Sequence, residues 1–377
     1  MRTGDLGVPF RLPLLMLGFA ALISGVLAGL ARLGWSVPPS MADLAALHGP
    51  LMVSGFLGTV IGLERAVAMG RRWAYTGPLL TGVGTIAILA GTPLAVGAGA
   101  ITLGSAVLLA GTARLTLRQP ELFMITMTLG ALSWLAGNLL WLTGAPLPAV
   151  VPPWINFLVL TIAGERLELS RFLPPSPTAR RVFAIILAAI VAGSFLAWHA
   201  AGIMLYGAGL AALALWLLRQ DIARRTVRTQ GLTRFIAVCL LSGYAWLAVG
   251  SATLLAAGSL SGLAYDAALH AILLGFVFSM VFGHAPVIFP AVVRVKIPYH
   301  WTFYVPLIVL HASLILRLAG DGLADPGLRS LGGMLNAIAL ALFIVNTIAS
   351  VIRGARADGA SRAAPGAPEG TTHAPGH

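Results

Sequence analysis

Apolar stretches of roughly 20 residues, the length that crosses a bilayer as an α-helix, follow one another along almost the whole sequence. Hydrophobic residues make up 58% of the 377 residues and charged residues only 10%, and the mean hydropathy is +0.91. A soluble domain does not need so much apolar surface with so few charges. The sequence therefore predicts an all-α polytopic membrane protein of about twelve transmembrane helices. The expected spans are 12–31, 48–68, 77–94, 96–116, 122–143, 150–168, 181–199, 201–218, 233–257, 265–290, 302–319 and 330–352.

Charged residues in the connections orient these helices. Arginine or lysine follows every even-numbered span up to the tenth, whereas the connections after odd-numbered spans carry few cations. The positive-inside rule then places both termini in the cytoplasm of a bacterium, with the chain in its inner membrane. The net charge of +12 is spread over these short loops, which argues against nucleic-acid binding. The loop cations are Arg71, Arg72, Arg114, Arg118, Arg171, Arg180, Arg181, Arg224, Arg225, Arg228, Arg294 and Lys296.

Residues 1–353 are expected to form a single transmembrane domain, followed by a Gly-, Pro- and Ala-rich disordered cytoplasmic tail over 354–377. Cys239 is the only cysteine and lies in an apolar run. A single cysteine excludes disulfides within the chain, thiolate metal clusters and covalent haem attachment of the CxxCH type.

Three of the predicted spans resemble one another. The second span contains GFLGTVIGLER, the sixth NFLVLTIAGER and the tenth GFVFSMVFGHA. Alignment on the leading Gly/Asn-Phe places Glu64, Glu165 and His284 at one position. Because every fourth helix matches, the sequence predicts three units of four helices around a pseudo-threefold axis.

Two histidines are expected at the same depth near the outer face. His48 begins the second span, where Pro50 fits the first turn of a helix, and His270 lies about one turn into the tenth. Asp266 precedes His270 by one helical turn and is placed to accept its second ring N–H, which would fix the tautomer. Two neutral imidazoles that face one another from different helices are what bis-histidine haem iron requires.

The other histidines fall elsewhere. His284 lies roughly 21 Å further along the same helix, at 1.5 Å per residue, and cannot share that iron. His311 lies near mid-membrane in the eleventh span. Since an ionisable group inside a membrane is costly, His284 and His311 are candidates for a second metal site. His199 and His300, close to span ends, are interpreted as structural.

The HGPLM…GF stretch, the LHAILLG…GH stretch and the helix layout resemble the NnrS family. These haem- and copper-containing membrane proteins are linked to nitric-oxide stress and are similar to heme–copper oxidase subunit I. The resemblance implies one b-type haem held by His48 and His270, with a redox or nitric-oxide-related role. The copper-binding histidines of the oxidases are missing from the sixth span and are reduced to His199 in the seventh, so oxidase-type oxygen chemistry is not expected.

A haem near the outer face would need cations for its propionates, and Arg32 and Arg317 are the nearest candidates. The expected partners are the lipid bilayer and an electron donor, either a cytochrome or a quinol. Two alternatives remain open. Met52 and Met280 each lie one turn from a histidine and offer soft ligands for copper, as in a copper carrier. The third hypothesis is a structural membrane subunit of a respiratory complex.

Two Glu-Arg pairs close the second and sixth spans. Neighbours on a helix do not face each other, so Glu64 and Glu165 are expected to pair across helices. One interpretation is an interfacial anchor in which the arginines reach the headgroups. The other places Glu64, Glu165 and His284 in a ring that forms a proton path, a metal site or a quinone pocket.

Overall fold

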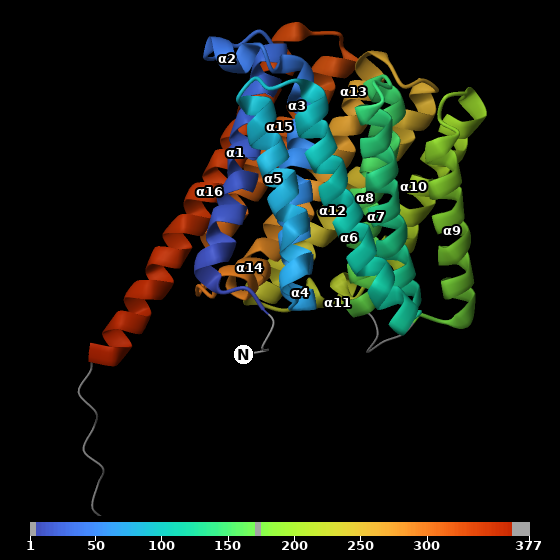
Figure 1. The fold of residues 1–377 in the computed structure, drawn as a ribbon. Helices are drawn as coiled ribbons and strands as arrows, with labels where there is room; N and C mark the ends of the chain where they lie inside the picture. The colour runs from blue at the N-terminus through green and yellow to red at the C-terminus, as the bar shows by residue number, and fades with distance from the viewer. Residues whose placement is uncertain (1–4, 170–174, 364–377) are drawn as a thin grey trace, which may run out of the picture.

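The computed structural model describes residues 5–169 and 175–363, and in these residues every regular element is helical. Within these described residues, eleven helices are long and apolar enough to cross a membrane, which confirms the polytopic all-α fold (Figure 1). All twelve predicted spans are helical, but the third, α5, has only 14 residues. At 1.5 Å per residue it is about 21 Å long, which is shorter than a bilayer core.

The eleven spanning helices of the described residues, together with the shorter α5, form three successive groups of four. Two of them are composite: the His48 helix is Ala45–Met69 and the His270 helix is Gly262–Val293. The elements are α1 (Val8–Arg32), α2 (Pro39–Ala42), η1 (Ala45–Leu47), α3 (His48–Pro50), η2 (Leu51–Leu57), α4 (Gly58–Met69), η3 (Arg72–Tyr75), α5 (Thr76–Leu89), α6 (Leu94–Arg118), α7 (Leu122–Leu142), α8 (Leu147–Leu169), α9 (Pro177–Phe195), α10 (Ala200–Gln220), α11 (Ala223–Thr226), α12 (Gly231–Ala257), α13 (Gly262–His270), η5 (Ala271–Phe278), α14 (Ser279–Val293), η6 (Trp301–Phe303), α15 (Tyr304–Gly322) and α16 (Pro326–Ala363).

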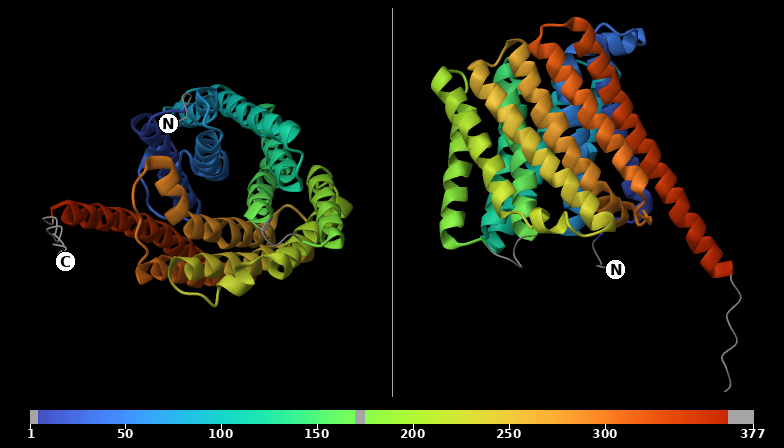
Figure 2. Two further views of the ribbon diagram at one scale, coloured as in Figure 1. Left: turned by 90° about the horizontal axis from the view of Figure 1, so that it is seen from below. Right: turned by 180° about the vertical axis from the view of Figure 1, so that it is seen from behind.

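The same packing order repeats in each group of four. The first helix packs against the second, the second against the third and the third against the fourth. The groups then join through α6 with α7, α10 with α12, and α16 with α1. Seen from below, α9 and α10 lie on one side of the bundle and the end of α16 on the other (Figure 2). This order agrees with the three-unit repeat predicted from the sequence.

Arginines at one end of the bundle join the three groups. Arg65 of the first group pairs with Glu165 of the second. Arg166, the next residue, makes a bidentate pair with Asp221 at 2.7 and 3.0 Å. Asp221 leads into the third group, where it also accepts a hydrogen bond from Tyr244 at 2.5 Å. Arg65 and Arg166 occupy the same position of the repeat, so the repeat also places the contacts between groups.

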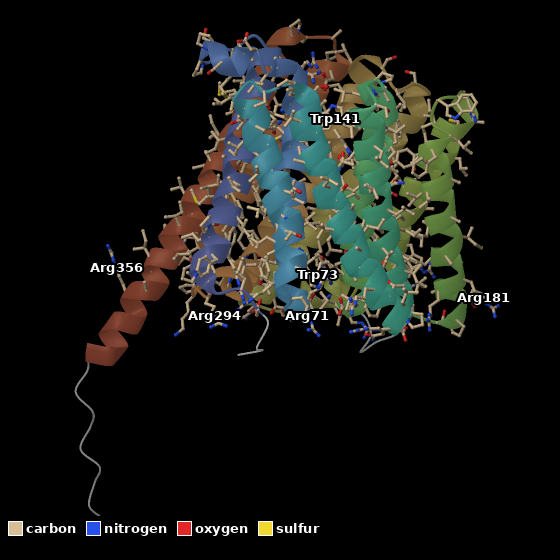
Figure 3. The ribbon with its side chains drawn as sticks, in the orientation of Figure 1. Arg71, Trp73, Trp141, Arg181, Arg294 and Arg356 are labelled. Atoms are coloured by element: carbon tan, nitrogen blue, oxygen red, sulfur yellow. The ribbon has the colours of Figure 1, made fainter. Side chains whose placement is uncertain are left out.

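A third contact closes the bundle between α1 and the His270 helix. Arg11 donates to the backbone carbonyl of Val292 at 3.1 Å and pairs with Asp5 at 2.5 Å. Asp5 also accepts a hydrogen bond from Tyr75 at 2.7 Å. Figure 3 shows Arg71, Arg181 and Arg294 toward this same end, which we call the arginine-rich end.

The C-terminal boundary differs from the prediction. Helix α16 continues to Ala363, whereas the disordered tail was expected to begin at residue 354. The helix of the last span therefore continues through the small and charged residues that follow it. Residues 364–377, the rest of the predicted tail, lie outside the described residues.

Candidate functional site

His48 and His270 face each other across the gap between their two helices. The centroids of the two imidazole rings are 6.5 Å apart, and the ring planes differ by only 10°. The expectation that two histidines from the second and tenth spans meet at one depth is therefore confirmed.

Both rings are fixed by backbone carbonyls. Nδ1 of His48 donates to the carbonyl of Gly25 at 2.7 Å, and Nδ1 of His270 donates to that of Asp266, also at 2.7 Å. An Nδ1–H that donates to an acceptor leaves the lone pair on Nε2. Among the described residues neither Nε2 has a hydrogen-bond partner, so both lone pairs are available to a ligand placed between the rings.

A π-helical segment begins three residues after His48 and one residue after His270. Residues Leu51–Leu57 follow His48 and its first turn, which ends at Pro50, and residues Ala271–Phe278 follow His270. The α-helical part of the second span begins at His48, close to the predicted start, and a 3-10 turn over Ala45–Leu47 precedes it. π-Helical segments inside α-helices are rare and occur mainly at functional sites. Here the wider turns give the two histidines the same local environment, a feature for which the sequence carries no clear signal.

Helix α1 forms a cradle of glycines for His48. A Cβ at Gly29 would lie 2.7 Å from Nδ1 of His48, and a Cβ at Gly25 would lie 2.8 Å from the sulfur of Met52. Only glycine lets the ring and the thioether approach α1 so closely. Sequence reasoning missed these two residues, although their spacing is the small-xxx-small pattern of packed membrane helices.

Charged side chains surround the outer edge of the histidine pair. The Asp266 carboxylate pairs with Arg317 at 2.8 Å and Arg329 at 3.0 Å, and its contact to Nδ1 of His270 is longer, at 3.4 Å. Asp266 therefore does hold His270 as expected, but through its backbone carbonyl. The physical reason is that two guanidinium groups compete for the carboxylate.

The same cluster of charged residues includes a hydrogen-bond donor that is free to bind a ligand. Nε of Arg317 is buried without a hydrogen-bond partner among the described residues. Arg32 and Arg317 both lie close enough for their charges to act on the His48 ring. Arg329, which the sequence analysis did not assign to the site, also pairs with Asp321 at 2.8 Å. Three cations against two carboxylates leave this edge suited to further anionic groups.

The separation of the rings fits one metal between them. Metal bonds to histidine nitrogen are about 2.0–2.1 Å, and about 1.1 Å separates each nitrogen from its ring centroid, so two trans imidazoles have centroids about 6.3 Å apart. The observed 6.5 Å matches this value. The described residues hold no group of three or more His, Cys, Asp or Glu side chains placed for a metal ion. Two imidazoles are the protein ligands that a bis-histidine haem needs, since the haem ring supplies the other four nitrogens.

His311 lies in a different part of the fold. Its Nδ1 accepts a hydrogen bond from the indole N–H of Trp246 at 2.9 Å, and its Nε2 donates to the hydroxyl of Ser242 at 3.1 Å. Both ring nitrogens are thus engaged by α12. The structure does not bring His311 together with His284, the other candidate for a second metal.

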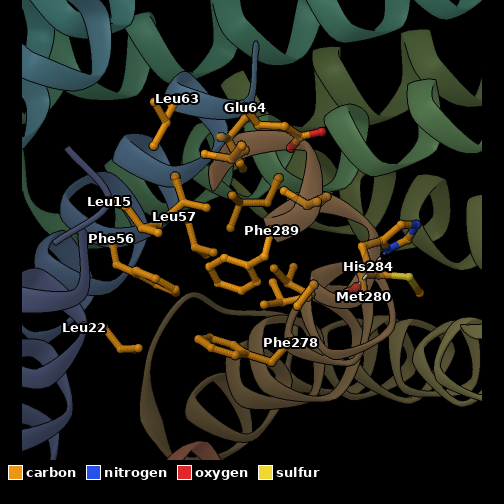
Figure 4. A pocket seen from close by; sticks show the side chains of 18 of the residues that line it. Leu15, Leu22, Phe56, Leu57, Leu63, Glu64, Phe278, Met280, His284 and Phe289 are labelled. Carbon is orange, nitrogen blue, oxygen red and sulfur yellow. Dashed lines mark hydrogen bonds between the residues drawn. The ribbon is translucent and has the colours of Figure 1, made fainter. Parts of the chain in front are cut away.

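His284 instead lines a cavity with both glutamates of the repeat. Glu64, Glu165 and His284 border an otherwise apolar cavity between α1, the His48 helix, α8, the His270 helix and α16 (Figure 4). Glu165 pairs across helices with Arg65, as expected, whereas the 3.8 Å pair of Glu64 is with its own neighbour Arg65. Met280 turns its methyl group toward Gly243 of α12. The sequence alignment therefore found three residues that meet at one cavity.

The sequence matches a protein family whose function is unknown. A family model described as a domain of unknown function, DUF8744, matches residues 11–352. No curated protein matches the sequence. The match covers every spanning helix, including both histidines of the pair and the cavity beneath them.

Proposed function

We propose that this chain, which belongs to the DUF8744 family of unknown function, binds one haem b between His48 and His270 and serves in electron transfer in the membrane. The observation that carries the proposal is the pair of near-parallel imidazole rings with centroids 6.5 Å apart. Haem supplies one-electron exchange at its iron when it is bound. The chain itself supplies two oriented Nε2 lone pairs and a charged outer edge.

Each part of the site has a separate task. The carbonyls of Gly25 and Asp266 hold the ring tautomers, and such outer contacts strengthen the ligand nitrogens. Arg32, Arg317 and Arg329 are the cations available to the propionates. A haem held by both imidazoles would have no free position for a gas ligand. This geometry favours electron transfer, and a nitric-oxide-related role would follow from the partner that receives the electron.

The methionine positions favour haem over a copper carrier. The sulfur of Met52 packs on Gly25 of α1, the helix to which His48 turns its Nδ1. The Met52 sulfur therefore lies against the helix that holds Nδ1 of His48, whereas Nε2 of the same ring is the nitrogen left free for a ligand.

The spectrum of the purified protein tests the proposal. Protein produced with ample haem supply is expected to be red, with sharp α and β bands on reduction, a b-type pyridine haemochrome and one iron per chain. Two imidazoles without covalent attachment give this low-spin signature. A colourless protein would refute the proposal, and copper in place of iron in the metal analysis would turn it toward copper handling.

The chain is a multi-pass membrane protein, and we propose that it lies in a bacterial inner membrane with both termini in the cytoplasm. The arginine-rich end would then face the cytoplasm and the histidine pair would lie near the outer face. Cysteine placed at Arg225 is expected to react with an impermeant thiol reagent only from the cytoplasm, and cysteine at Ser259 only from outside. Cys239 is buried and provides an unlabelled background. The reverse labelling pattern would invert the topology.

A further inference from the structure

The cavity bordered by Glu64, Glu165 and His284 is a site of its own, separate from the histidine pair. It has a volume of about 110 Å³, and its walls are almost entirely apolar. Its wall includes Phe56 and Phe278. The centroids of their rings are 6.0 Å apart, and the ring planes differ by 19°. Each follows its histidine by eight residues (56 − 48 and 278 − 270), which places the aromatic pair beneath the two imidazoles.

One of the residues that line the cavity has a buried polar atom without a partner among the described residues. Nδ1 of His284 donates to the carbonyl of Met280 at 2.8 Å, so Nε2 carries the lone pair. This Nε2 is buried and has no hydrogen-bond partner within the described residues. A buried acceptor without a donor costs free energy, and a ligand with a hydroxyl group would remove that cost. Glu64 borders the cavity on the same side as His284 (Figure 4), and its carboxylate is a second acceptor.

We propose that this cavity binds the ring of a hydroquinone, with one hydroxyl donating to Nε2 of His284. An engineered apolar cavity of about 150 Å³ holds benzene. This cavity, at about 110 Å³, is smaller, so a six-membered ring enters it only if the lining side chains shift outward. The flat aromatic side chains match a flat ring. The binding stands on the cavity alone, and a role for the bound hydroquinone as electron donor would rest on the proposed function.

The apolar tail of such a molecule has a route into the bilayer. Leu15 and Phe19 of α1 and Phe343 of α16 line the cavity, so it lies between the first and last helices of the chain. Figures 1 and 2 show the C-terminal half of α16 leaning away from the bundle at the arginine-rich end. A tail that extended from the cavity along α16 would meet lipid where this helix leaves the bundle.

Binding of ubiquinol-1, a single-ring hydroquinone with a short tail, tests the site. The full chain is loaded with haem and reconstituted in nanodiscs, and the dissociation constant is measured by equilibrium binding under anaerobic conditions. His284→Phe removes the acceptor, and Val281→Trp fills the cavity. Each is expected to weaken binding at least about tenfold, because a lost hydrogen bond to a buried group has an effect of this order. His300→Phe, the same substitution at an exposed position, is expected to bind like the unmodified chain.

The outcomes separate this inference from the haem proposal. Absence of ubiquinol-1 binding, or equal affinity in all variants, overturns the cavity as the site. Weaker binding in Val281→Trp alone overturns the contact to His284. The low-spin haem spectrum, recorded on the same samples, is expected to be unchanged in every variant and also shows that each is folded. Binding without that spectrum refutes the haem proposal and leaves the quinol site standing.

Discussion

Replacing His48 or His270 with alanine is expected to abolish the low-spin haem spectrum altogether, or to convert it to a high-spin spectrum with the one remaining ligand. The two rings are the only imidazoles that face each other across this gap among the described residues, and iron in a low-spin bis-histidine site needs both. Absorption spectra of the reduced variants and the iron content per chain provide the measurement.

Two substitutions nearby serve as controls. His284→Ala should leave the spectrum intact, because its ring lies roughly 21 Å along the helix from His270 at the helical rise. Asp266→Asn keeps the backbone carbonyl that holds His270, so haem should be retained. The midpoint potential of the haem in this variant should shift, because the carboxylate that pairs with Arg317 and Arg329 is lost. Loss of haem in His284→Ala but not in His48→Ala would move the haem to the arginine-rich end and refute the assignment.

Asp221→Ala is expected to destabilise the fold more than any other single substitution discussed here, by about 3–5 kcal/mol. The change removes the bidentate partner of Arg166, the acceptor of the Tyr244 hydroxyl and the acceptor of the Ala223 N–H at 2.8 Å. These contacts join the second and third helix groups. The free energy of unfolding, or the midpoint of thermal unfolding in detergent, measures the effect.

Asp43→Ala provides the matched control, because Asp43 is exposed on the short segment after α1 and a surface change of this kind is worth at most about 0.5 kcal/mol. Burial acts to raise the pKa of Asp221, but hydrogen bonds from Arg166 and Tyr244 outweigh it and hold the pKa below its usual value. The stabilisation is therefore present above the unfolded pKa of about 3.9 and is lost as the pH falls through the lower folded value. Equal stability of the two variants at neutral pH would contradict this assignment.

The sequence was sufficient for features that depend on one helix at a time. Apolar windows located all twelve helical stretches, because the membrane requires length and apolarity from each helix separately. Helical rise and the start of each span set the depth of His48 and His270, which is why their meeting was predictable. The alignment of Glu64, Glu165 and His284 worked for the same reason, since residues at one depth of neighbouring helices line one cavity.

Contacts made across helices required the tertiary structure. The sequence indicated that Asp266 holds His270, but only the fold shows that Arg317 and Arg329 take its carboxylate and leave the backbone carbonyl for the ring. No sequence pattern around Asp221 predicts its bidentate pair with Arg166. Such contacts depend on the rotation of each helix about its own axis, which packing decides and hydropathy does not.

The amino-acid sequence by itself determined the all-helical membrane fold, the approximate positions of its helices and the residues that recur every fourth helix. Only the tertiary structure decided which of these side chains touch. It placed Gly29 of α1 against His48 and occupied both nitrogens of His311. It also left Nε2 of His284, in a residue that lines an apolar cavity, without a partner among the described residues. The physical reason is that depth follows from counting residues along one helix, whereas a contact is fixed by the mutual rotation and close packing of several.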